Sequence, residues 1–209
     1  MKDKKTHNYT DVRRLTNSRF LNLYEMDALT QSGARFNYYF ASRRIDEKIR
    51  INAGGTDPEG MCVYAIKEDD PEKLLILNQY RYPIDMYIYE VPAGLIEDGE
   101  TPEEAAVREV KEETGLILTP YADVDPALKR PYVLAQGFSD EMGVNVYGTV
   151  TGSFSDDRQE DSERIEAFFI DKKEAKRILE EEQISMRAQM MLVQFIHSDP
   201  RDPFAFLRL

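Results

Sequence analysis

Residues 94–116 read GLIEDGETPEEAAVREVKEETGL, and they contain signals for both ends of one helix. Thr101 is a favourable N-cap, Pro102 suits the first helical position, and Glu104 lies three residues after the cap, where it can complete a capping box. Gly115 supplies the left-handed residue that ends many helices. The stretch therefore predicts a helix that begins near residue 102 and ends near residue 114.

The predicted helix carries three glutamates on one narrow face. At about 100° per residue, Glu113 lies about 40° around the axis from Glu109, and Glu112 about 60° to the other side. Like charges at this spacing repel one another, and a bound cation would remove that cost. The simpler alternative is a solvated acidic face, in which Arg108 and Lys111 are local partners.

The spacing of these residues along the chain resembles a known signature. Gly94 is followed after five residues by Glu100 and, after seven more, by the run REVKEETGL at residues 108–116. This order is similar to the signature of the Nudix hydrolases, which cut nucleoside diphosphates linked to another group. The resemblance implies an α+β fold, a Nudix α/β/α sandwich with a mixed β-sheet, and a loop–helix–loop that holds Mg²⁺ or Mn²⁺ against a pyrophosphate.

The resemblance also implies roles for the acidic residues. Mg²⁺ prefers oxygen ligands and is usually held through a few carboxylates. Arg108 is expected to orient the carboxylates of the helix rather than to contact substrate. Arg108 and Glu112 are both catalytic candidates. Glu100 fits either a metal contact or a structural bond to the helix. The implied metal ligands are Glu109 and Glu113, Glu112 as a supplementary ligand, and the backbone carbonyl of Ala93.

The composition restricts the class of protein. With 209 residues the chain fits one domain with an appendage, and 39 acidic against 27 basic residues give a net charge of −12. A nucleic-acid polymer is therefore a poor partner, because its binding surface would need a basic stripe. Only His7 and His197 could supply imidazole, which argues against a zinc site or a Ser-His-Asp triad.

Cysteine and hydropathy patterns indicate the compartment. Cys62 is the only cysteine, so no intramolecular disulfide can form, and its apolar surroundings in the sequence predict a buried thiol in a strand. The basic N-terminus lacks a following apolar segment, and no run approaches the ~20 apolar residues of a membrane span. We expect no signal peptide, no membrane partner and a cytoplasmic location.

The N-terminal part of the chain predicts a small separate sheet. Residues 1–17 predict a loose arm or one short helix, whereas residues 20–30 and 36–42 predict a hairpin. Such a sheet resembles the ADP-ribose and ADP-sugar pyrophosphatases, in which it packs across a two-fold axis and an aromatic residue near the position of Tyr38 stacks on adenine. The resemblance implies a homodimer built on this sheet. The alternative is a hairpin packed on its own domain, with Tyr38 as ordinary strand filler.

Two further motifs of the same subfamily precede the signature. Strands predicted at 61–68 and 73–80 lead into QYRYP at residues 79–83, and EVPAG follows at residues 90–94. These resemble the QYR-x-P and E-x-PAG elements. Arg81 at a strand end is well placed to bind phosphate through two hydrogen bonds, and the alternative is a surface pair with Glu90 or Asp85. Glu90 is expected to hold the nucleotide or the dimer partner.

The stretch at 135–141 departs from the subfamily pattern. ADP-ribose pyrophosphatases often carry Ser-Pro-Gly here, whereas this chain has Ala135-Gln136-Gly137. The glycine and the acidic end at Glu141 are kept, and the proline is not. This departure weakens ADP-ribose as the named substrate without affecting the pyrophosphate chemistry. Glu141 and Arg43, at the end of the predicted hairpin, complete the substrate-binding candidates.

The acidic segment at 155–163 is polar enough to be a mobile loop. Charge runs of this kind are usually solvated linkers. Its end, however, resembles the loop that carries the catalytic glutamate in this subfamily, and a loop that closes over bound substrate is a common gating device. Glu163 is the first candidate for the catalytic base and Glu160 the second, whereas Glu166 is expected in the last strand.

Two helices are expected after the last strand. Asp171 caps one that runs to about Glu182, and Ser185 caps the other. The second helix is apolar on most sides, which predicts burial against the sheet or against a second subunit.

Together these features predict a metal-dependent hydrolase of nucleoside diphosphate sugars, with a dimerisation hairpin in residues 1–55 and the Nudix domain in residues 56–209. The expected reaction converts ADP-ribose into AMP and ribose 5-phosphate. Another sugar nucleotide, such as a UDP- or GDP-sugar, is the first alternative substrate. A non-catalytic domain that senses a nucleotide sugar is the second alternative, and the presence of all three signature carboxylates argues against it.

Overall fold

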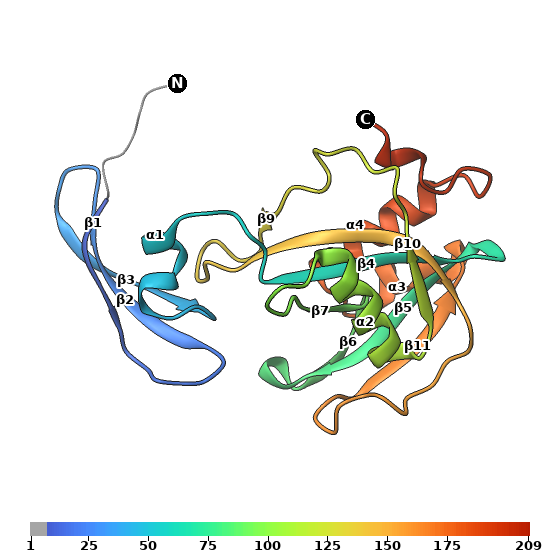
Figure 1. Ribbon diagram of the computed structural model, residues 1–209, viewed down its shortest axis with the longest axis horizontal. Helices are drawn as coiled ribbons and strands as arrows, with labels where there is room; N and C mark the ends of the chain where they lie inside the picture. The colour runs from blue at the N-terminus through green and yellow to red at the C-terminus, as the bar shows by residue number, and fades with distance from the viewer. Residues whose placement is uncertain (1–7) are drawn as a thin grey trace. The chain divides into compact units, whose positions relative to one another are not determined.

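The computed structural model describes residues 8–209 and divides the chain into two compact units (Figure 1). The first unit comprises the residues up to Asp57 together with Tyr132–Met142. The second comprises Pro58–Pro131 and Gly143–Leu209. Residues 132–142 thus join a unit that the sequence assigned to residues 1–55 alone.

The first unit is built on a three-stranded antiparallel sheet. Its elements are β1 Tyr9–Arg14, β2 Asn22–Leu29, β3 Arg35–Ser42, η1 Asp46–Lys48, α1 Arg50–Ala53 and β9 Tyr132–Val133. The sheet order is β1-β2-β3, and the predicted hairpin corresponds to β2 and β3. The expectation of a loose arm or short helix is wrong for residues 9–14, because they pair with β2 as an antiparallel strand. Arg13 on β1 also forms cross-strand ion pairs with Glu25 at 2.9 Å and Asp27 at 3.0 Å. The rest of that arm up to His7 lies outside the described residues.

The first unit has a small core. Tyr24, Phe40 and Ile49 are buried together, and the rings of Tyr24 and Phe40 stack with centroids 5.3 Å apart. The sheet therefore keeps apolar surface in contact with solvent. The exposed aromatic side chains of β3 are Phe36, Tyr38 and Tyr39.

The second unit contains a mixed sheet, as predicted. Its strands are β4 Gly60–Lys67, β5 Asp70–Arg81, β6 Met86–Glu90, β7 Ala93–Leu95, β8 Ile117–Pro120, β10 Met142–Thr151 and β11 Ile165–Ile170. The order is β11-β5-β4-β10-β8, with β6 beside β5 and β7 beside β4. β10 runs parallel to β4, whereas β5 is antiparallel to β4, β6 and β11. Residues 74–77 of β5 are fully buried, as their continuous apolar run predicts.

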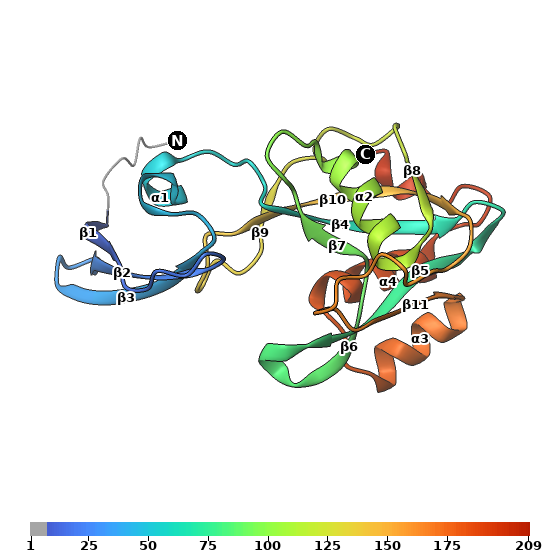
Figure 2. The same cartoon turned by 60° about the horizontal axis from the view of Figure 1, so that its bottom comes forward.

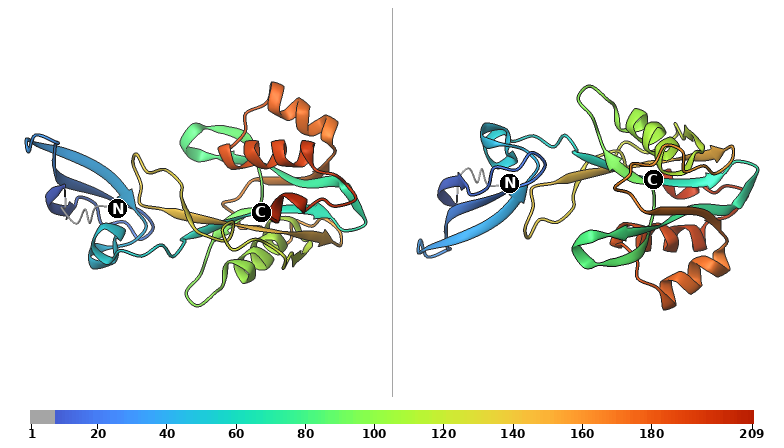
Figure 3. Two further views of the ribbon diagram at one scale, coloured as in Figure 1. Left: turned by 90° about the horizontal axis from the view of Figure 1, so that it is seen from above. Right: turned by 90° about the horizontal axis from the view of Figure 1, so that it is seen from below.

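Helices cover both faces of this sheet, which confirms the predicted α/β/α sandwich. They are α2 Pro102–Thr114, α3 Lys172–Glu181 and α4 Met186–His197, with 3₁₀ turns η2 Tyr82–Ile84 and η3 Ala205–Leu207. Figures 2 and 3 show α2 on one face and α3 and α4 on the other. Val110 of α2 packs in one core with Leu75, and Phe195 of α4 packs in the other with Tyr64 and Ile76.

Side-chain caps begin α3 and α4 at the predicted residues. Asp171 accepts a hydrogen bond from the Glu174 N–H, and Ser185 accepts one from the Ala188 N–H. These bonds satisfy backbone donors that the first turn of a helix leaves free.

The predicted burial of α4 against the sheet is confirmed for one side of the helix, and burial of its other side against a second subunit stays a prediction. Phe195 is buried, but Met186, Met190 and Val193 are 66%, 61% and 41% exposed. The 12-residue helix packs on the sheet with its opposite side only. Within residues 8–209 no helix, α4 included, is long and apolar enough to cross a membrane.

Candidate functional site

The ends of α2 are fixed by the contacts that its sequence predicts. Thr101 Oγ1 accepts a hydrogen bond from the Glu104 N–H at 3.2 Å, and Glu104 Oε2 accepts one from the Thr101 N–H at 2.8 Å. Gly115 follows the helix with a φ of 79°, and a Cβ there would lie 2.6 Å from the backbone nitrogen of Ser155. The helix therefore begins and ends where it was predicted to.

Arg108 holds three glutamates around one guanidinium group. Nε and Nη2 donate to the two oxygens of Glu100, each at 2.9 Å, and Nη1 donates to Glu109 at 2.9 Å and to Glu112 at 3.3 Å. Nη2 also donates to the Leu95 carbonyl at 2.9 Å. The hydrogen bonds from Arg108 lower the pKa of Glu100 to about 2. Of the two roles that the sequence left open for Glu100, this geometry favours the structural bond to the helix.

Glu113 carries a carboxylate that the surrounding protein does not neutralise. Its side chain is buried, and within the described residues its Oε2 has no hydrogen-bond partner. Burial raises the pKa of Glu113 well above its usual value, and the charges of Glu109 and Glu163 raise it further. Burial also raises the pKa of Glu109. Negative charge on either residue is therefore costly unless a cation lies beside it.

The donor set of α2 suits a hard divalent cation. Carboxylate oxygens are the ligands that Mg²⁺ prefers. Residues 8–209 contain no three His, Cys, Asp or Glu side chains already clustered as ligands of one ion, and Arg108 binds oxygens of both Glu109 and Glu112. Gly94 leaves space for Glu109, since a Cβ at residue 94 would lie 2.0 Å from its carboxyl carbon. The residues therefore fit such an ion, with Glu113 supplying the oxygen that lacks a partner.

An open cavity of about 840 Å³ lies beside α2. It brings both candidates for the catalytic base, Glu160 and Glu163, together with Glu109 and Glu112 of the helix. Six carboxylates and two guanidinium groups line it, so its field is negative. The lining residues are Ala93, Gly94, Leu95, Ile96, Glu97, Asp98, Arg108, Glu109, Glu112, Arg158, Glu160 and Glu163.

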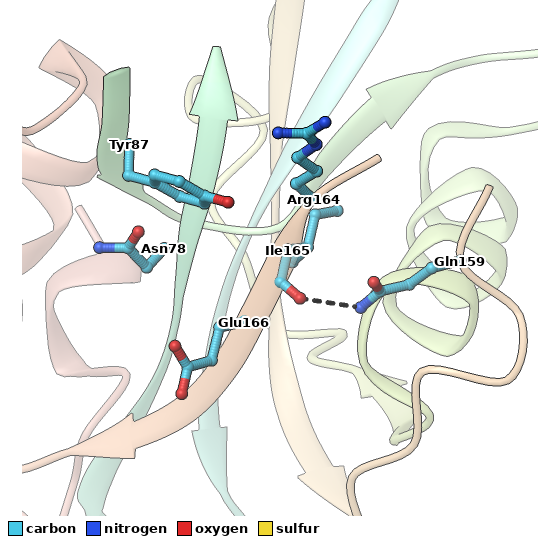
Figure 4. A pocket seen from close by; sticks show the side chains of 6 residues that line it. All are labelled: Asn78, Tyr87, Gln159, Arg164, Ile165 and Glu166. Carbon is cyan, nitrogen blue, oxygen red and sulfur yellow. Dashed lines mark hydrogen bonds between the residues drawn. The ribbon is translucent and has the colours of Figure 1, made fainter. Parts of the chain in front are cut away.

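Contacts to the C-terminal end of α2 hold the loop at residues 155–163. The Ser155 N–H donates to the Thr114 carbonyl at 3.0 Å. The Gln159 side-chain amide donates to the Glu113 carbonyl at 2.8 Å and to the Ile165 carbonyl at 3.2 Å. Figure 4 shows the second of these bonds in a smaller cavity, which is also lined by Asn78, Tyr87, Arg164 and Glu166.

The NUDIX domain family model matches residues 58–191, a range that includes α2, its cavity and the loop at 155–163. The chain belongs to the Nudix family. This match confirms the resemblance that the spacing of residues 94–116 indicated.

Curated relatives are similar to this chain over different lengths. The ADP-ribose pyrophosphatase of Bacillus subtilis is 27% identical over 141 residues, which are 66% of this chain and 72% of the relative. The ADP-ribose pyrophosphatase of Saccharomyces cerevisiae is 40% identical over 76 residues, 35% of this chain and 33% of the relative. The ADP-sugar pyrophosphatase of Mus musculus is 54% identical over 44 residues, 21% of this chain and 20% of the relative.

A solved structure has the same fold. The crystal structure of an ADP compounds hydrolase matches with a TM-score of 0.67 and 19% sequence identity, over 92% of this chain and 94% of the other. This likeness shows the fold. The family match and the relatives indicate an ADP-ribose pyrophosphatase-like chain and a Nudix pyrophosphohydrolase.

In the Nudix domain, Arg81 and Glu90 lie together as an ion pair. Arg81 Nε donates to Glu90 Oε2, and Glu90 is buried. This is one of the pairings that the sequence allowed as an alternative to phosphate binding. The charge of Arg81 also reaches Glu113, where it offsets a small part of the rise in pKa. The substrate roles of Arg81 and Glu90 stay predictions.

The other three substrate candidates lie in the first unit. The Tyr38 hydroxyl donates to the Gly137 carbonyl at 2.6 Å, and Arg43 Nε donates to Glu141 at 3.1 Å. These contacts bring the β3 strand and the segment at 135–141 together within that unit. Contact of Tyr38, Arg43 and Glu141 with a nucleotide stays a prediction.

Sequence reasoning did not single out Arg158, Glu97 or Asp98 as residues of the site, although all three line the cavity beside α2. Arg158 is the only cation among residues 155–163, and it lines the cavity together with the carboxylates. The net charge of the segment hid it, since the run reads as uniformly acidic. The signal that could have found it was a single arginine inside a loop expected to carry the base. Glu166, by contrast, lies in β11 as predicted.

Proposed function

We propose that this Nudix protein hydrolyses the pyrophosphate of an ADP-sugar, first of all ADP-ribose, to AMP and ribose 5-phosphate. Relatives named ADP-ribose pyrophosphatase and ADP-sugar pyrophosphatase support the choice of substrate. The observation that carries the proposal is the buried Glu113 Oε2, which has no partner in the described part of the chain. It belongs to the helix whose other carboxylates, Glu109 and Glu112, line the cavity.

The proposed cofactor is a divalent metal ion, Mg²⁺ or Mn²⁺. Glu109 and Glu113 would hold it, with Glu112 as a supplementary ligand and the Ala93 carbonyl as a backbone ligand. When bound, such an ion neutralises charge on the phosphates and lowers the pKa of an attacking water. Burial raises the pKa values of both Glu109 and Glu113, and the charges of Glu109 and Glu163 raise that of Glu113 further, so a neighbouring cation would favour the charged form of both residues.

The remaining roles belong to the side chains of the cavity. Arg108 keeps Glu109 and Glu112 in place through its hydrogen bonds. Glu163, or Glu160 beside it, accepts a proton from the water as the water oxygen bonds to phosphorus and the bridging P–O bond breaks. The two phosphates then leave on separate products, and the proton passes to solvent.

The test is hydrolysis by the purified protein with Mg²⁺. The panel contains ADP-ribose, UDP-glucose, GDP-mannose, diadenosine polyphosphates and NADH, and the products are separated by chromatography. We expect ADP-ribose to be the best substrate and to yield AMP and ribose 5-phosphate in equal amounts. A preference for UDP-glucose or GDP-mannose would instead support the sugar-nucleotide alternative, which the missing proline beside Gly137 keeps open.

Two substitutions on α2 test whether activity depends on Glu113 in particular or on the loss of any acidic residue from the helix. Glu113→Gln is expected to lower kcat by about 10- to 100-fold or more, because it removes a metal-binding charge. Glu103→Gln lies in the first turn of the same helix, outside the cavity, and is expected to keep wild-type activity. Full activity of the Glu113→Gln variant would refute the ligand assignment.

A further inference from the structure

The charge of the cavity beside α2 is unfavourable for an anionic substrate. Six carboxylates and two guanidinium groups line it. A diphosphate adds further negative charge, so its oxygens need cationic partners on the protein in addition to any metal ion.

The arginines that the sequence singled out already have partners. Arg108 is bonded to three glutamates and one carbonyl. Arg81 is paired with Glu90, and in the first unit Arg43 is paired with Glu141 at 3.1 Å. All five N–H groups of Arg108 are donated, so it would have to give up a bond before it could bind a phosphate. The charges of Arg81 and Arg43 are each offset by the carboxylate with which they pair.

Arg158 has no such partner. It is exposed, lines the cavity, and makes no hydrogen bond or ion pair with any residue that the structure describes. Its guanidinium is therefore the cation of this cavity that can bind a ligand without first losing a bond. A guanidinium can donate two parallel hydrogen bonds to phosphate oxygens.

The backbone next to Arg158 is fixed although its side chain is free. Gln159 donates to the Glu113 carbonyl at 2.8 Å and to the Ile165 carbonyl at 3.2 Å. The loop is thereby attached to the helix that carries the proposed metal ligands. Gln159 acts as a positioning residue that keeps Arg158 at the wall of the cavity.

We propose that Arg158 binds phosphate oxygens of the diphosphate substrate in this cavity. The inference rests on the proposed function and deepens it, because it assigns the protein cation that meets the substrate. The substrate class is any diphosphate ester whose phosphates reach the carboxylate face of α2.

The first test compares steady-state hydrolysis of ADP-ribose by the wild type, Arg158→Gln and Arg158→Lys. We expect Arg158→Gln to raise KM by about 10- to 100-fold, as for the loss of a charged hydrogen bond, and Arg158→Lys to recover part of the loss. Arg187→Gln is the matched control, because Arg187 lies on α4, which packs on the other face of the sheet. It is expected to leave KM unchanged.

The second test is calorimetric binding of inorganic pyrophosphate in the presence of Mg²⁺, which does not depend on turnover. We expect the affinity to fall in Arg158→Gln, to recover partly in Arg158→Lys, and to stay at the wild-type value in Arg187→Gln. If the wild type does not hydrolyse ADP-ribose but binds pyrophosphate more tightly than Arg158→Gln does, the proposed substrate is rejected. The assignment of Arg158 as a phosphate-binding residue is then retained. Equal pyrophosphate affinities and equal KM values for the wild type and Arg158→Gln would overturn it, as would a wild-type protein that binds no pyrophosphate.

Discussion

The buried, charged carboxylate of Glu113 lowers the stability of the folded protein, and the same carboxylate is a ligand in the proposed metal site. Its pKa in the folded protein lies above the ordinary value of 4.5, first because of burial and then because of Glu109 and Glu163. The folded state therefore binds a proton more readily than the unfolded state does. The stability that Glu113 contributes is present below about pH 4.5 and is lost as the pH rises through the folded-state pKa.

We expect Glu113→Gln to raise the Tm of the metal-free protein at mildly alkaline pH, because a neutral amide needs no counter-charge. Each kcal/mol corresponds to about 2–4 °C for a chain of this size. The gain should shrink as the pH is lowered through the folded-state pKa, where the wild-type carboxyl takes up its proton, and should be lost below about pH 4.5. Differential scanning calorimetry in the presence of a chelator measures both effects. Glu103→Gln is the control, and a Tm gain that is the same at all pH values would contradict the charge argument.

The residues of the site differ in how far the sequence could predict them. Glu109, Glu112 and Glu113 share a helix, so helical geometry alone places them together. The partner of Glu100 and the pairing of Arg81 with Glu90 depend on side-chain conformations and on strand neighbours, and the sequence left both open. Glu160 and Glu163 come from another part of the chain, and only the resemblance to a family pointed to them.

At the scale of the element, the capping box makes the start of α2 independent of distant contacts. Thr101→Ala removes the oxygen that accepts the Glu104 N–H, and we expect it to cost about 1 kcal/mol. Thr101→Ser keeps this oxygen and should retain most of the stability. Thermal or urea unfolding of the two variants measures the difference. If the alanine variant is as stable as the serine variant, the cap does not limit the stability of the fold.

Elements with local signals were predicted more accurately than elements held by distant contacts. The caps and the final glycine define α2 within its own sequence, and the predicted and observed ends agree. β1 has few apolar residues, and it is defined by its antiparallel pairing with β2, a partner outside its own sequence. Within one chain the apolar surface of α4 at Met190 stays exposed, because only the opposite side of the helix packs on the sheet, and its burial by a second subunit stays a prediction.

At the scale of the whole molecule, the two units differ in the size of their cores. The second unit has a core on each face of its sheet, whereas the buried cluster in the described part of the first consists of Tyr24, Phe40 and Ile49. A three-stranded sheet with so small a core gains stability from a further covering surface. The apolar residues of the sheet indicate that it needs a covering surface. The sequence does not identify the segment or chain that covers it, because this depends on contacts between residues far apart in sequence or between chains.

We expect this surface to be a second copy of the chain, so that light scattering gives twice the chain mass of 24.2 kDa. Tyr39 on β3 is 49% exposed, and Tyr39→Glu should shift the mass to that of a single chain, because a charge buried in an apolar interface is costly. Met190→Glu is the matched control on α4, where Met190 is 61% exposed, and it should leave the dimer intact. If Met190→Glu separates the chains and Tyr39→Glu does not, the interface lies over α4, the other surface for which the sequence allowed a second subunit.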